Sequence, residues 1–366
     1  MDRMRPQAPF PPEEVVEVLD ATAPLWPGLR GTRLFITGGT GFFGCWLLET
    51  LLAANRRFGV GLEATVLSRD PDAFARRLPH LRGAPGLSWV QGSAVDLDAG
   101  RVAKALQRPA AGLTFDAVIH LTTEADNDRT VADPRGAFDV IAGSTRRALE
   151  FAAAVKVRRF LFTSSGSAYG LQPPTLAKMP EDFSGSPDAT DLTSGYAISG
   201  SAKRVAEELC VAFGKSRRIE TVVARCFAFS GPGLPMDGKF ALGNFLADAL
   251  AGRDIMVKGD GTPVRSYLYA SDLAIWLWTL LARGAPGRTY NVGSEHAVTI
   301  RETAEIVRCE LAPAARLQIL TLPDLSRPTH RYVPSTARAR DELGLAERVG
   351  LAEAVRRTAA WLGWTR

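Results

Sequence analysis

The chain has 366 residues, enough to bury a large core as one big domain or two. Hydrophobic residues make up 46% of it and charged residues 23%, which argues against a disordered chain or a coiled coil. Because 44 Lys and Arg stand against 39 Asp and Glu, the net charge of +5 indicates a mixed surface, and it fits binding of an anionic small molecule better than binding of nucleic acid.

The cysteines and apolar runs exclude several other classes. The four cysteines, Cys45, Cys210, Cys226 and Cys309, are scattered and form no CxxC motif, so neither a metal site nor a disulfide framework is expected. The chain has no 18-residue apolar run, and its first residues carry no apolar signal-peptide core. We therefore expect a cytoplasmic protein that does not bind membranes.

Strand-like and helix-like segments alternate along the first half of the chain. The pattern predicts a short helix over 12–26, strands over 32–39, 64–69, 87–92, 115–122 and 158–165, and helices over 45–58, 71–78, 99–107 and 134–155. The strands are short, continuous apolar runs, as expected when both faces of a sheet are covered. The prediction is an α/β fold with a doubly wound parallel (Rossmann) sheet.

After about residue 175 this alternation loosens. A loop rich in Pro, Ser and Asp covers 171–191, further loops cover 230–239 and 258–265, and a final helix is predicted over 351–364. These features predict a smaller α/β C-terminal lobe interleaved with the sheet. The predicted domains are an extension with a short helix at 1–30, a Rossmann domain at 31–175 to which 205–230 and 265–295 return, and a substrate-binding lobe of 176–204, 231–264 and 296–366.

Three glycines, Gly38, Gly41 and Gly44, lie between a predicted strand and a predicted helix in ITGGTGFFG. Glycines at this spacing permit a tight turn, close approach of the backbone to a pyrophosphate, and packing of the helix on the strand. Between a strand and a helix, the spacing predicts a dinucleotide site. The predicted cofactor contacts are Gly38, Thr40, Gly41, Phe42, Phe43, Gly44, Ser68, Arg69, Ser93, Leu121 and Lys203.

The end of the second strand bears on the choice of cofactor. It reads Leu67-Ser68-Arg69-Asp70, where many dinucleotide sites place an acid for the ribose hydroxyls. A hydroxyl and a guanidinium suit a 2′-phosphate better, because Arg pairs with phosphate through two hydrogen bonds. The sequence therefore favours NADP, while Asp70, if turned inward, would favour NAD.

A series of motifs carries a family resemblance. TGGTGFFG, VIHL, FTSSGSAYG, a Tyr…Lys helix, RCFAFSGPG, GDGTPVRSYLYASDLA and YNVGS follow one another in this order. Over residues 32–364 the chain resembles an extended short-chain dehydrogenase/reductase of the sugar-nucleotide epimerase/dehydratase kind. Only the first thirty residues lie outside this resemblance.

The resemblance implies roles for several residues. Ser165 matches the residue that hydrogen-bonds the reacting sugar oxygen, and Arg265 matches the arginine that grips the nucleotide diphosphate. Asn244 lies where the family often binds nucleotide, and Ser167 is expected at the substrate beside Ser165. His120 matches a histidine without a proton-transfer role, so we expect a structural group there.

Several positions depart from the family pattern, and the first departure disfavours one of the family's reactions. Dehydratases of the family place Asp and Glu directly after the catalytic Thr, whereas this chain has Gly166 and Ser167. Neither residue offers a group that takes up and releases a proton near neutral pH, which disfavours water loss by that route. Ser93 stands at the family's adenine-contacting Asp, and Ala228 replaces the Asn of RxFN.

The catalytic Tyr and Lys of the family lie four residues apart, but here Tyr196 precedes Lys203 by seven. On a straight helix this raises the axial separation from about 6 Å to about 10.5 Å. At an effective dielectric of 20, the attraction of Lys⁺ for a phenolate then falls from about 4 kcal/mol at 4 Å to under about 2 kcal/mol at 10 Å.

Four interpretations of the Tyr and Lys spacing remain open. An irregular turn at 199–201 would fold Tyr196 back beside Lys203, since Gly200 tolerates unusual φ. Alternatively, Ser199 occupies the position of the family's tyrosine, four residues before Lys203. In the third, Tyr196 works with the cofactor's charge while Lys203 reaches along the helix. In the last, Tyr196 is only a packed aromatic at a helix start capped by 193–195.

The predicted function is an NAD(P)-dependent epimerase of a nucleoside-diphosphate sugar that acts by transient oxidation at C4, with Ser165, Tyr196, Lys203 and Ser199 as catalytic candidates. The alternatives are a nucleotide-sugar 4-ketoreductase or dehydratase, and a non-catalytic cofactor-binding protein with a broken Tyr–Lys pair. Tyr196 is also expected to line the substrate site. A homodimer is expected through the helices at 137–154 and after Lys203.

Overall fold

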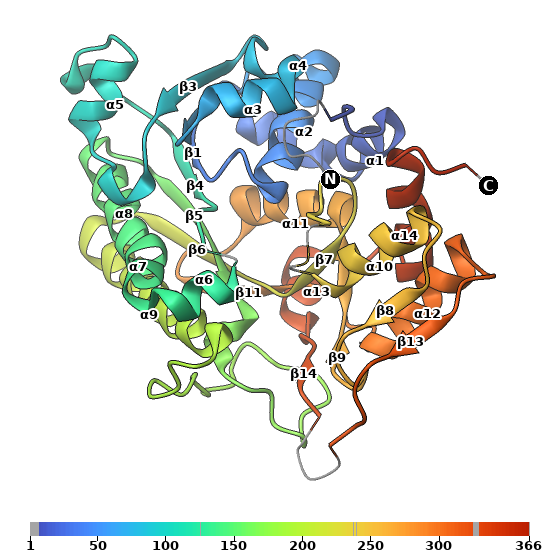
Figure 1. Cartoon of the computed structure of the whole chain (residues 1–366). Helices are drawn as coiled ribbons and strands as arrows, with labels where there is room; N and C mark the ends of the chain where they lie inside the picture. Colours follow the sequence, from blue (N-terminus) through green and yellow to red (C-terminus); the bar gives the residue numbers. More distant parts are fainter. Residues whose placement is uncertain (1–6, 125, 237, 239, 325–328, 366) are drawn as a thin grey trace.

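A seven-stranded parallel sheet organises the molecule (Figure 1). The computed structural model describes residues 7–124, 126–236, 238, 240–324 and 329–365. The strand order is β3 (Leu87–Gln91), β2 (Glu63–Ser68), β1 (Arg33–Thr37), β4 (Ala117–His120), β5 (Arg159–Ser165), β6 (Glu220–Cys226) and β11 (Arg288–Val292). Every pair is parallel, so the predicted doubly wound sheet is confirmed.

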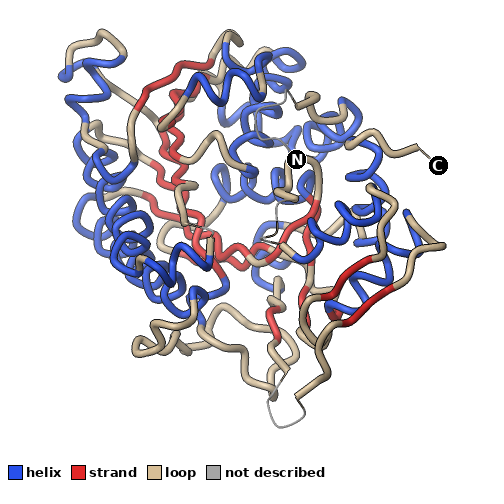
Figure 2. The backbone as a smooth tube through the Cα atoms, in the orientation of Figure 1, coloured by secondary structure: helices blue, strands red, loops and turns tan. Residues whose placement is uncertain are grey.

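Successive residues along each strand are buried on opposite faces of this sheet. Leu34 and Ile36 of β1 belong to one core cluster, and Phe35 between them belongs to another. Helices α1 (Pro12–Thr22), α2 (Phe42–Phe58) and α11 (Ala270–Arg283) cover the first face, and α8 (Ser144–Ala154) and α9 (Gly195–Arg217) cover the second (Figures 1 and 2). The side-chain period of two along each strand thus separates the two cores.

Shorter elements surround the seven-stranded sheet. They are η1 (Ala23–Leu29), α3 (Pro71–Arg77), α4 (Pro79–Arg82), η2 (Ala94–Asp96), α5 (Ala99–Ala105), η3 (Ala110–Gly112), α6 (Asn127–Ala132), α7 (Pro134–Phe138) and η5 (Gly166–Tyr169). A π-helical segment, Asp139–Gly143, joins α7 to α8, so the helix predicted over 134–155 forms with a bulge. The long helix α9 begins at Gly195, just before the tyrosine of the Tyr…Lys segment.

The remaining elements gather beside the sheet. They are β7 (Ala228–Ser230), α10 (Ala241–Leu250), β8 (Ile255–Val257), β9 (Val264–Arg265), β10 (Tyr267–Tyr269), β12 (Val298–Thr299), α12 (Ile300–Leu311), β13 (Leu317–Ile319), β14 (Arg331–Tyr332), α13 (Ala337–Leu343) and α14 (Leu351–Trp361). Helices α10, α12 and α14 share a separate apolar cluster. The final helix ends at Trp361, short of the predicted residue 364.

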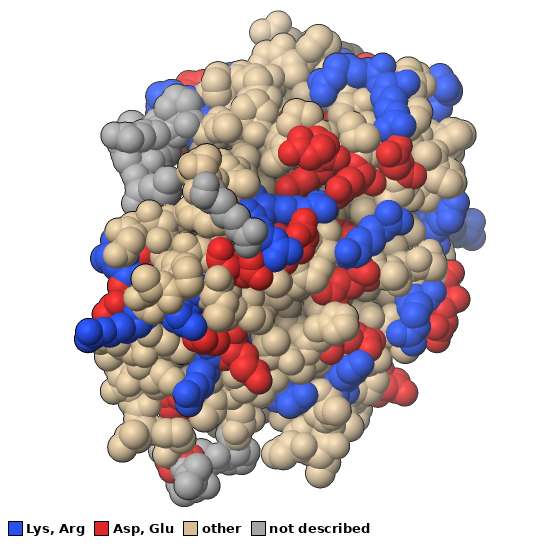
Figure 3. All heavy atoms as spheres, turned by 90° about the vertical axis from the view of Figure 1, so that its right-hand side faces the viewer, with Lys and Arg blue, Asp and Glu red and all other residues tan. Residues whose placement is uncertain are grey.

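The surface carries both signs of charge. On the face drawn in Figure 3, Lys and Arg side chains lie interspersed with Asp and Glu, without a large field of one sign.

Within the described part of the chain, no helix combines the length and the apolar character that crossing a bilayer would need. The four cysteines are free thiols, of which Cys309 is exposed and the others are buried.

Candidate active site

The glycine turn joins β1 to α2 at the carboxyl edge of the sheet. Gly38 has a φ of +69°, and a Cβ there would lie 2.8 Å from the backbone carbon of Leu121. A Cβ on Gly44 would lie 2.3 Å from the Cα of Gly39. These positions keep bare backbone at the start of α2, which begins at Phe42 and is 17 residues long. Bare backbone and free helix N–H groups fit a dinucleotide pyrophosphate.

The other predicted cofactor contacts lie in this turn or after neighbouring strands. Thr40 and Gly41 are in the turn, Phe42 and Phe43 in the first helical turn of α2, Ser68 and Arg69 at the end of β2, Ser93 after β3, and Leu121 after β4. Ser68 is buried and Arg69 is exposed. One carboxylate oxygen of Asp70 accepts the backbone N–H of Ala73 at 2.8 Å and caps α3. Arg69 and Asp70 are both exposed at this strand end, and Asp70 has one of its two oxygens engaged by the helix.

His120 ends β4 inside the protein. Its Nδ1 lies 2.7 Å from the hydroxyl of Thr37, and its Nε2 lies 3.1 Å from the hydroxyl of Thr145. Burial, together with the charge of Lys203, lowers the pKa of His120 to about 3. A neutral imidazole held at both nitrogens agrees with the predicted structural role.

Ser165 projects past the neighbouring strand. His120, the last residue of β4, pairs with Phe162, so Thr163, Ser164 and Ser165 extend beyond it along β6. The Ser165 hydroxyl accepts the backbone N–H of Ser167 at 3.1 Å and lies 2.9 Å from the Ser167 hydroxyl. Two hydroxyls therefore face the same space at the carboxyl edge of the sheet.

Helix α9 is continuous from Gly195 to Arg217, so the irregular turn predicted at 199–201 is wrong. The Ser194 hydroxyl caps the helix by accepting the backbone N–H of Ala197 at 3.3 Å. Gly200 serves close packing, since a Cβ there would lie 2.3 Å from the Ser167 carbonyl oxygen. The helix therefore lies directly against the turn that follows Ser165.

Lys203 points from α9 to the adjacent strand. Its ammonium donates to the carbonyl of Thr163 at 2.8 Å and lies 4.8 Å from the ring centre of Phe162. The residue is only 4% exposed, and burial lowers the pKa of its ammonium to about 8. The cation thus lies beneath the strand that presents Ser165, and does not extend along the helix toward Tyr196.

Tyr196 lies one helical turn before Ser199. Its hydroxyl donates to the carbonyl of Gly170 at 2.9 Å. Its ring meets the rings of His330 and Tyr332 edge-on, with centroids 5.4 Å and 5.8 Å away. Burial raises the pKa of the phenol far above its ordinary value, with the neighbouring Tyr332 adding to the rise. Tyr196 therefore forms part of the wall between α9 and the C-terminal lobe, and Ser199 is the residue at the four-residue step from Lys203.

A buried ion pair holds α9 against the strands. Both carboxylate oxygens of Glu207 accept from the Arg225 guanidinium, at 2.9 Å and 2.5 Å. The Ser164 hydroxyl donates to the same carboxylate at 2.5 Å. Because Ser164 directly precedes Ser165, this network fixes the end of β5 relative to the helix that carries Lys203.

Tyr332 was not expected at the site. Its hydroxyl lies 3.2 Å from the Ser165 hydroxyl and 3.2 Å from the carbonyl of Cys226. Burial raises the pKa of this phenol to about 12. No local motif marks Tyr332, since its position depends on the pairing of β14 with β9, which sets Tyr332 opposite Arg265.

The predicted diphosphate ligand, Arg265, lies on β9, opposite Tyr332 of β14. Its guanidinium donates to the carbonyl of Val264 at 2.9 Å and contacts Nδ1 of His330 at 2.9 Å. Nε2 of His330 is buried and has no hydrogen-bond partner among the described residues. Asn244 is partly buried on α10. The Arg265 guanidinium also lies 5.9 Å from the ring centre of Tyr332, whose hydroxyl contacts Ser165, so Arg265 is a cation close to the hydroxyl cluster, whereas Asn244 lies on a different element.

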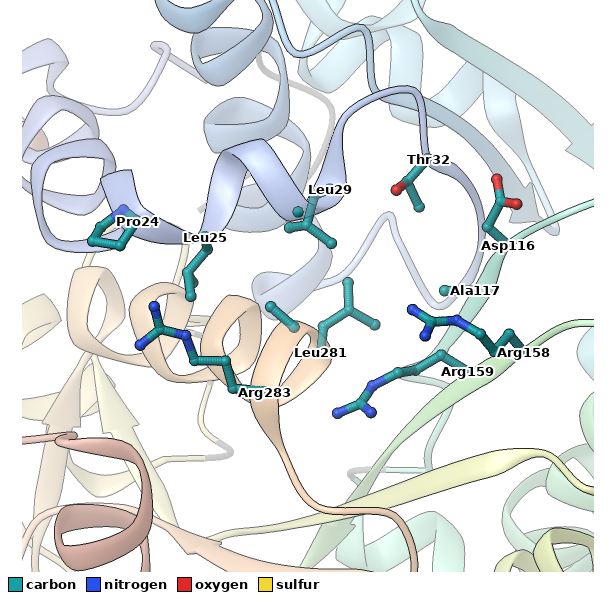
Figure 4. A pocket seen from close by; sticks show the side chains of 12 residues that line it. Pro24, Leu25, Leu29, Thr32, Asp116, Ala117, Arg158, Arg159, Leu281 and Arg283 are labelled. Carbon is teal, nitrogen blue, oxygen red and sulfur yellow. The ribbon is translucent and has the colours of Figure 1, made fainter.

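A separate pocket of about 180 Å³ lies at the opposite edge of the sheet (Figure 4). Its lining includes Leu25 and Leu29 of η1, Asp116 before β4, and Arg158 and Arg159 at the start of β5. Since Arg159 and Ser165 are the two ends of β5, about 20 Å of strand separates this pocket from the hydroxyl cluster. The pocket is therefore separate from the hydroxyl cluster.

Comparisons with known proteins find relatives that match most of the chain. UDP-glucuronic acid decarboxylase 1 of Arabidopsis thaliana is 26% identical over 334 residues, which is 91% of this chain and 70% of that protein. A dTDP-glucose 4,6-dehydratase of Streptomyces niveus is 26% identical over 332 residues, 90% of this chain and 92% of that protein.

Solved structures share the fold. An epimerase of Methanothermobacter thermautotrophicus superposes with a TM-score of 0.74 at 24% identity, covering 94% of this chain and 95% of its own. UDP-glucose 4-epimerase of Thermotoga maritima, solved with UDP-glucose, gives 0.75 at 19% identity, covering 90% and 98%. The sequence pattern of the NAD dependent epimerase/dehydratase family matches residues 34–293, and the chain belongs to this family.

Proposed function

We propose that the protein is a cytoplasmic NAD(P)-dependent epimerase of a nucleoside-diphosphate sugar, acting by transient oxidation of the sugar at C4. The observation that carries this proposal is the convergence of Ser165 and Lys203 on the carboxyl end of β5, at the sheet edge where the glycine turn opens. Hydride exchange at a secondary alcohol needs a group that orients the sugar oxygen, a cation near it, and a group that takes or returns the hydroxyl proton. Ser165 and Lys203 would supply the first two.

The bare backbone of Gly38, Gly41 and Gly44 would hold the dinucleotide, whose ring supplies hydride acceptance and return when bound. Lys203 would place its positive charge under the reacting edge of the cleft. Arg69 supports a preference for NADP, because the acid beside it is engaged as the cap of α3.

The sugar nucleotide would lie between the sheet and the C-terminal lobe. Arg265 and Asn244 would contact its diphosphate and nucleotide, and Ser165 and Ser167 its sugar. Relatives are named for UDP-glucuronic acid and dTDP-glucose, which supports a nucleoside-diphosphate sugar as the substrate class. Gly166 and Ser167 offer no acid for water loss, so a dehydratase is the weaker alternative.

Net reduction of a 4-keto sugar is the second candidate. It is favoured by the phenols of the cleft, because burial keeps the pKa of Tyr332 near 12 and that of Tyr196 well above its ordinary value. Neutral phenols donate protons, as reduction of a ketone needs. Tyr196 is displaced from the position four residues before Lys203. A cofactor-binding protein without turnover is therefore the third candidate.

One experiment separates these candidates. The purified protein is incubated with a panel of UDP- and dTDP-sugars and their 4-keto forms, with either dinucleotide, while NMR follows the sugar and absorbance follows the dinucleotide. An epimerase interconverts C4 epimers without net change in the dinucleotide, whereas a ketoreductase consumes it mole for mole. Tight dinucleotide binding with no turnover on the whole panel would contradict both enzymatic proposals.

We also propose a homodimer through α8 and α9. A surface hollow lies between Arg146 and Glu150 of α8 and Leu209 and Phe213 of α9. On α9, Val205 and Val211 are 42% and 43% exposed. Light scattering coupled to gel filtration should give about twice the chain mass, and a Phe213→Asp variant should be monomeric. A wild-type monomer at micromolar concentration would refute the dimer.

A further inference from the structure

The family's catalytic tyrosine lies four residues before the lysine, but this chain has Ser199 at that position. A different phenol nevertheless lies beside Ser165. It comes from β14, with the Tyr332 hydroxyl 3.2 Å from the Ser165 hydroxyl. We propose that Tyr332 takes the place of the tyrosine missing from position 199, and that it is the catalytic acid that gives its proton to the sugar carbonyl oxygen oriented by Ser165. This inference rests on the proposed hydride chemistry at C4.

Neighbouring residues leave space for the Tyr332 ring and pack against it. Gly166 has no side chain, and a Cβ there would lie 2.8 Å from the ring of Tyr332 and 2.7 Å from the ring of Phe227. The rings of Tyr332 and Phe227 pack with centroids 4.6 Å apart. Pairing of β14 with β9 then fixes Tyr332 opposite Arg265. Gly166, which stands where a family dehydratase has an acid, thus makes room for a phenol from the other lobe.

Tyr196 is held in a different arrangement. Its hydroxyl is 2.9 Å from the carbonyl of Gly170, whereas Lys203 bonds to the carbonyl of Thr163. Continuous helix separates the two side chains by about 10.5 Å along the axis. The Tyr196 hydroxyl therefore donates to Gly170, whereas the Tyr332 hydroxyl lies within 3.2 Å of both the Ser165 hydroxyl and the Cys226 carbonyl.

The chemistry balances with a reduced dinucleotide as the reductant. A hydride adds to the carbonyl carbon of the sugar, the C=O π bond breaks, and the oxygen takes the proton from the Tyr332 hydroxyl. This leaves a phenolate that water reprotonates. Because burial raises the pKa of Tyr332 to about 12, the group is a neutral acid at pH 7, which suits this direction. Reversal of the step needs the phenolate, so oxidation should accelerate as pH rises from 7 to 10.

The test compares Tyr332→Phe with Tyr196→Phe and with a matched control, Tyr267→Phe, which removes a buried phenol from β10. We expect Tyr332→Phe to lower kcat at least about 100-fold and to abolish the rise of oxidation with pH. Tyr196→Phe should lower kcat less than tenfold, and Tyr267→Phe less than threefold. Recovery of turnover in the double variant Ser199→Tyr/Tyr332→Phe would support the proposal that Tyr332 replaces the tyrosine missing from position 199. A Tyr332→Phe kcat within threefold of wild type, or a larger loss in Tyr196→Phe, overturns the inference.

A binding measurement without turnover separates the two levels of the proposal. Calorimetry with UDP-glucose and dTDP-glucose, set against UDP and dTDP alone, isolates the sugar contacts. Tyr332→Phe should weaken binding of the sugar nucleotide about three- to tenfold and leave the nucleoside diphosphate within twofold. Equal affinities of wild type and Tyr332→Phe for the sugar nucleotide overturn the role of Tyr332 alone. If wild type binds and converts no nucleotide sugar, the proposed function fails and this inference fails with it.

Discussion

Lys203 is expected to destabilise the folded protein, although the proposed reaction depends on its charge. Replacing it with methionine keeps a long, unbranched side chain and removes the charge. We predict that Lys203→Met raises the free energy of unfolding at pH 7 while lowering kcat at least about 100-fold, because the cation beside the reacting hydroxyl is gone.

The magnitude follows from the buried ammonium. Its pKa falls from 10.5 to about 8 on folding, and a shift of about 2.5 units at 1.36 kcal/mol each amounts to about 3 kcal/mol at pH 7. Loss of the hydrogen bond to Thr163 and of the contact with the Phe162 ring offsets about 1 kcal/mol of the gain. The expected net stabilisation is therefore about 2 kcal/mol.

The sign of the pH dependence is fixed. Between the folded and unfolded pKa values, the unfolded chain binds more protons than the folded chain, so the stability of wild type rises with pH across that window. The advantage of Lys203→Met should accordingly shrink from pH 7 to pH 10, where the penalty in wild type falls to about 1 kcal/mol or less.

Equilibrium urea unfolding followed by circular dichroism measures both values. The matched control is Lys215→Met, an exposed lysine on the same helix, which should change the stability by less than about 0.5 kcal/mol. A Lys203→Met protein less stable than wild type at pH 7, or a gain of the same size at pH 10, would refute this reasoning.

Three further outcomes are expected. Gly200→Ala should lower the free energy of unfolding by about 2 kcal/mol, because its Cβ would lie 2.3 Å from the Ser167 carbonyl oxygen, and an unchanged melting temperature would argue against this packing. Glu207→Ala should cost about 3–5 kcal/mol in urea unfolding by leaving the Arg225 guanidinium buried without its acid, and a loss below about 1 kcal/mol would rule that out. Arg69→Ala should weaken NADP⁺ binding about tenfold and leave NAD⁺ within twofold in fluorescence titrations, whereas equal losses would remove the case for NADP.

The parts of the site that depend on neighbouring residues were predictable from the sequence. The glycine turn and the strand that ends at Ser165 are local patterns, since apolar strands, glycine spacing and helix periodicity are written in short windows. Each then lies at the edge that the parallel sheet requires, because the carboxyl ends of parallel strands meet there.

The parts set by tertiary packing were not predictable in the same way. Gly200 suggested a break in α9, but its lack of a side chain serves the close approach of an unbroken helix to Ser167. Tyr332 reaches Ser165 only because two-residue strands, far apart in sequence, pair beside the cleft. Such short strands carry no periodic signal of their own.

Transfer of deuterium from a labelled reduced dinucleotide to the sugar tests the central claim most directly. The protein is incubated with the 4-keto forms of the UDP- and dTDP-sugars, and NMR and mass spectrometry locate the label. We predict deuterium on carbon 4 of the recovered nucleotide sugar. A dinucleotide that binds the protein but delivers deuterium to no carbon of any sugar in the panel would contradict the assignment of this cleft as a hydride-transfer site.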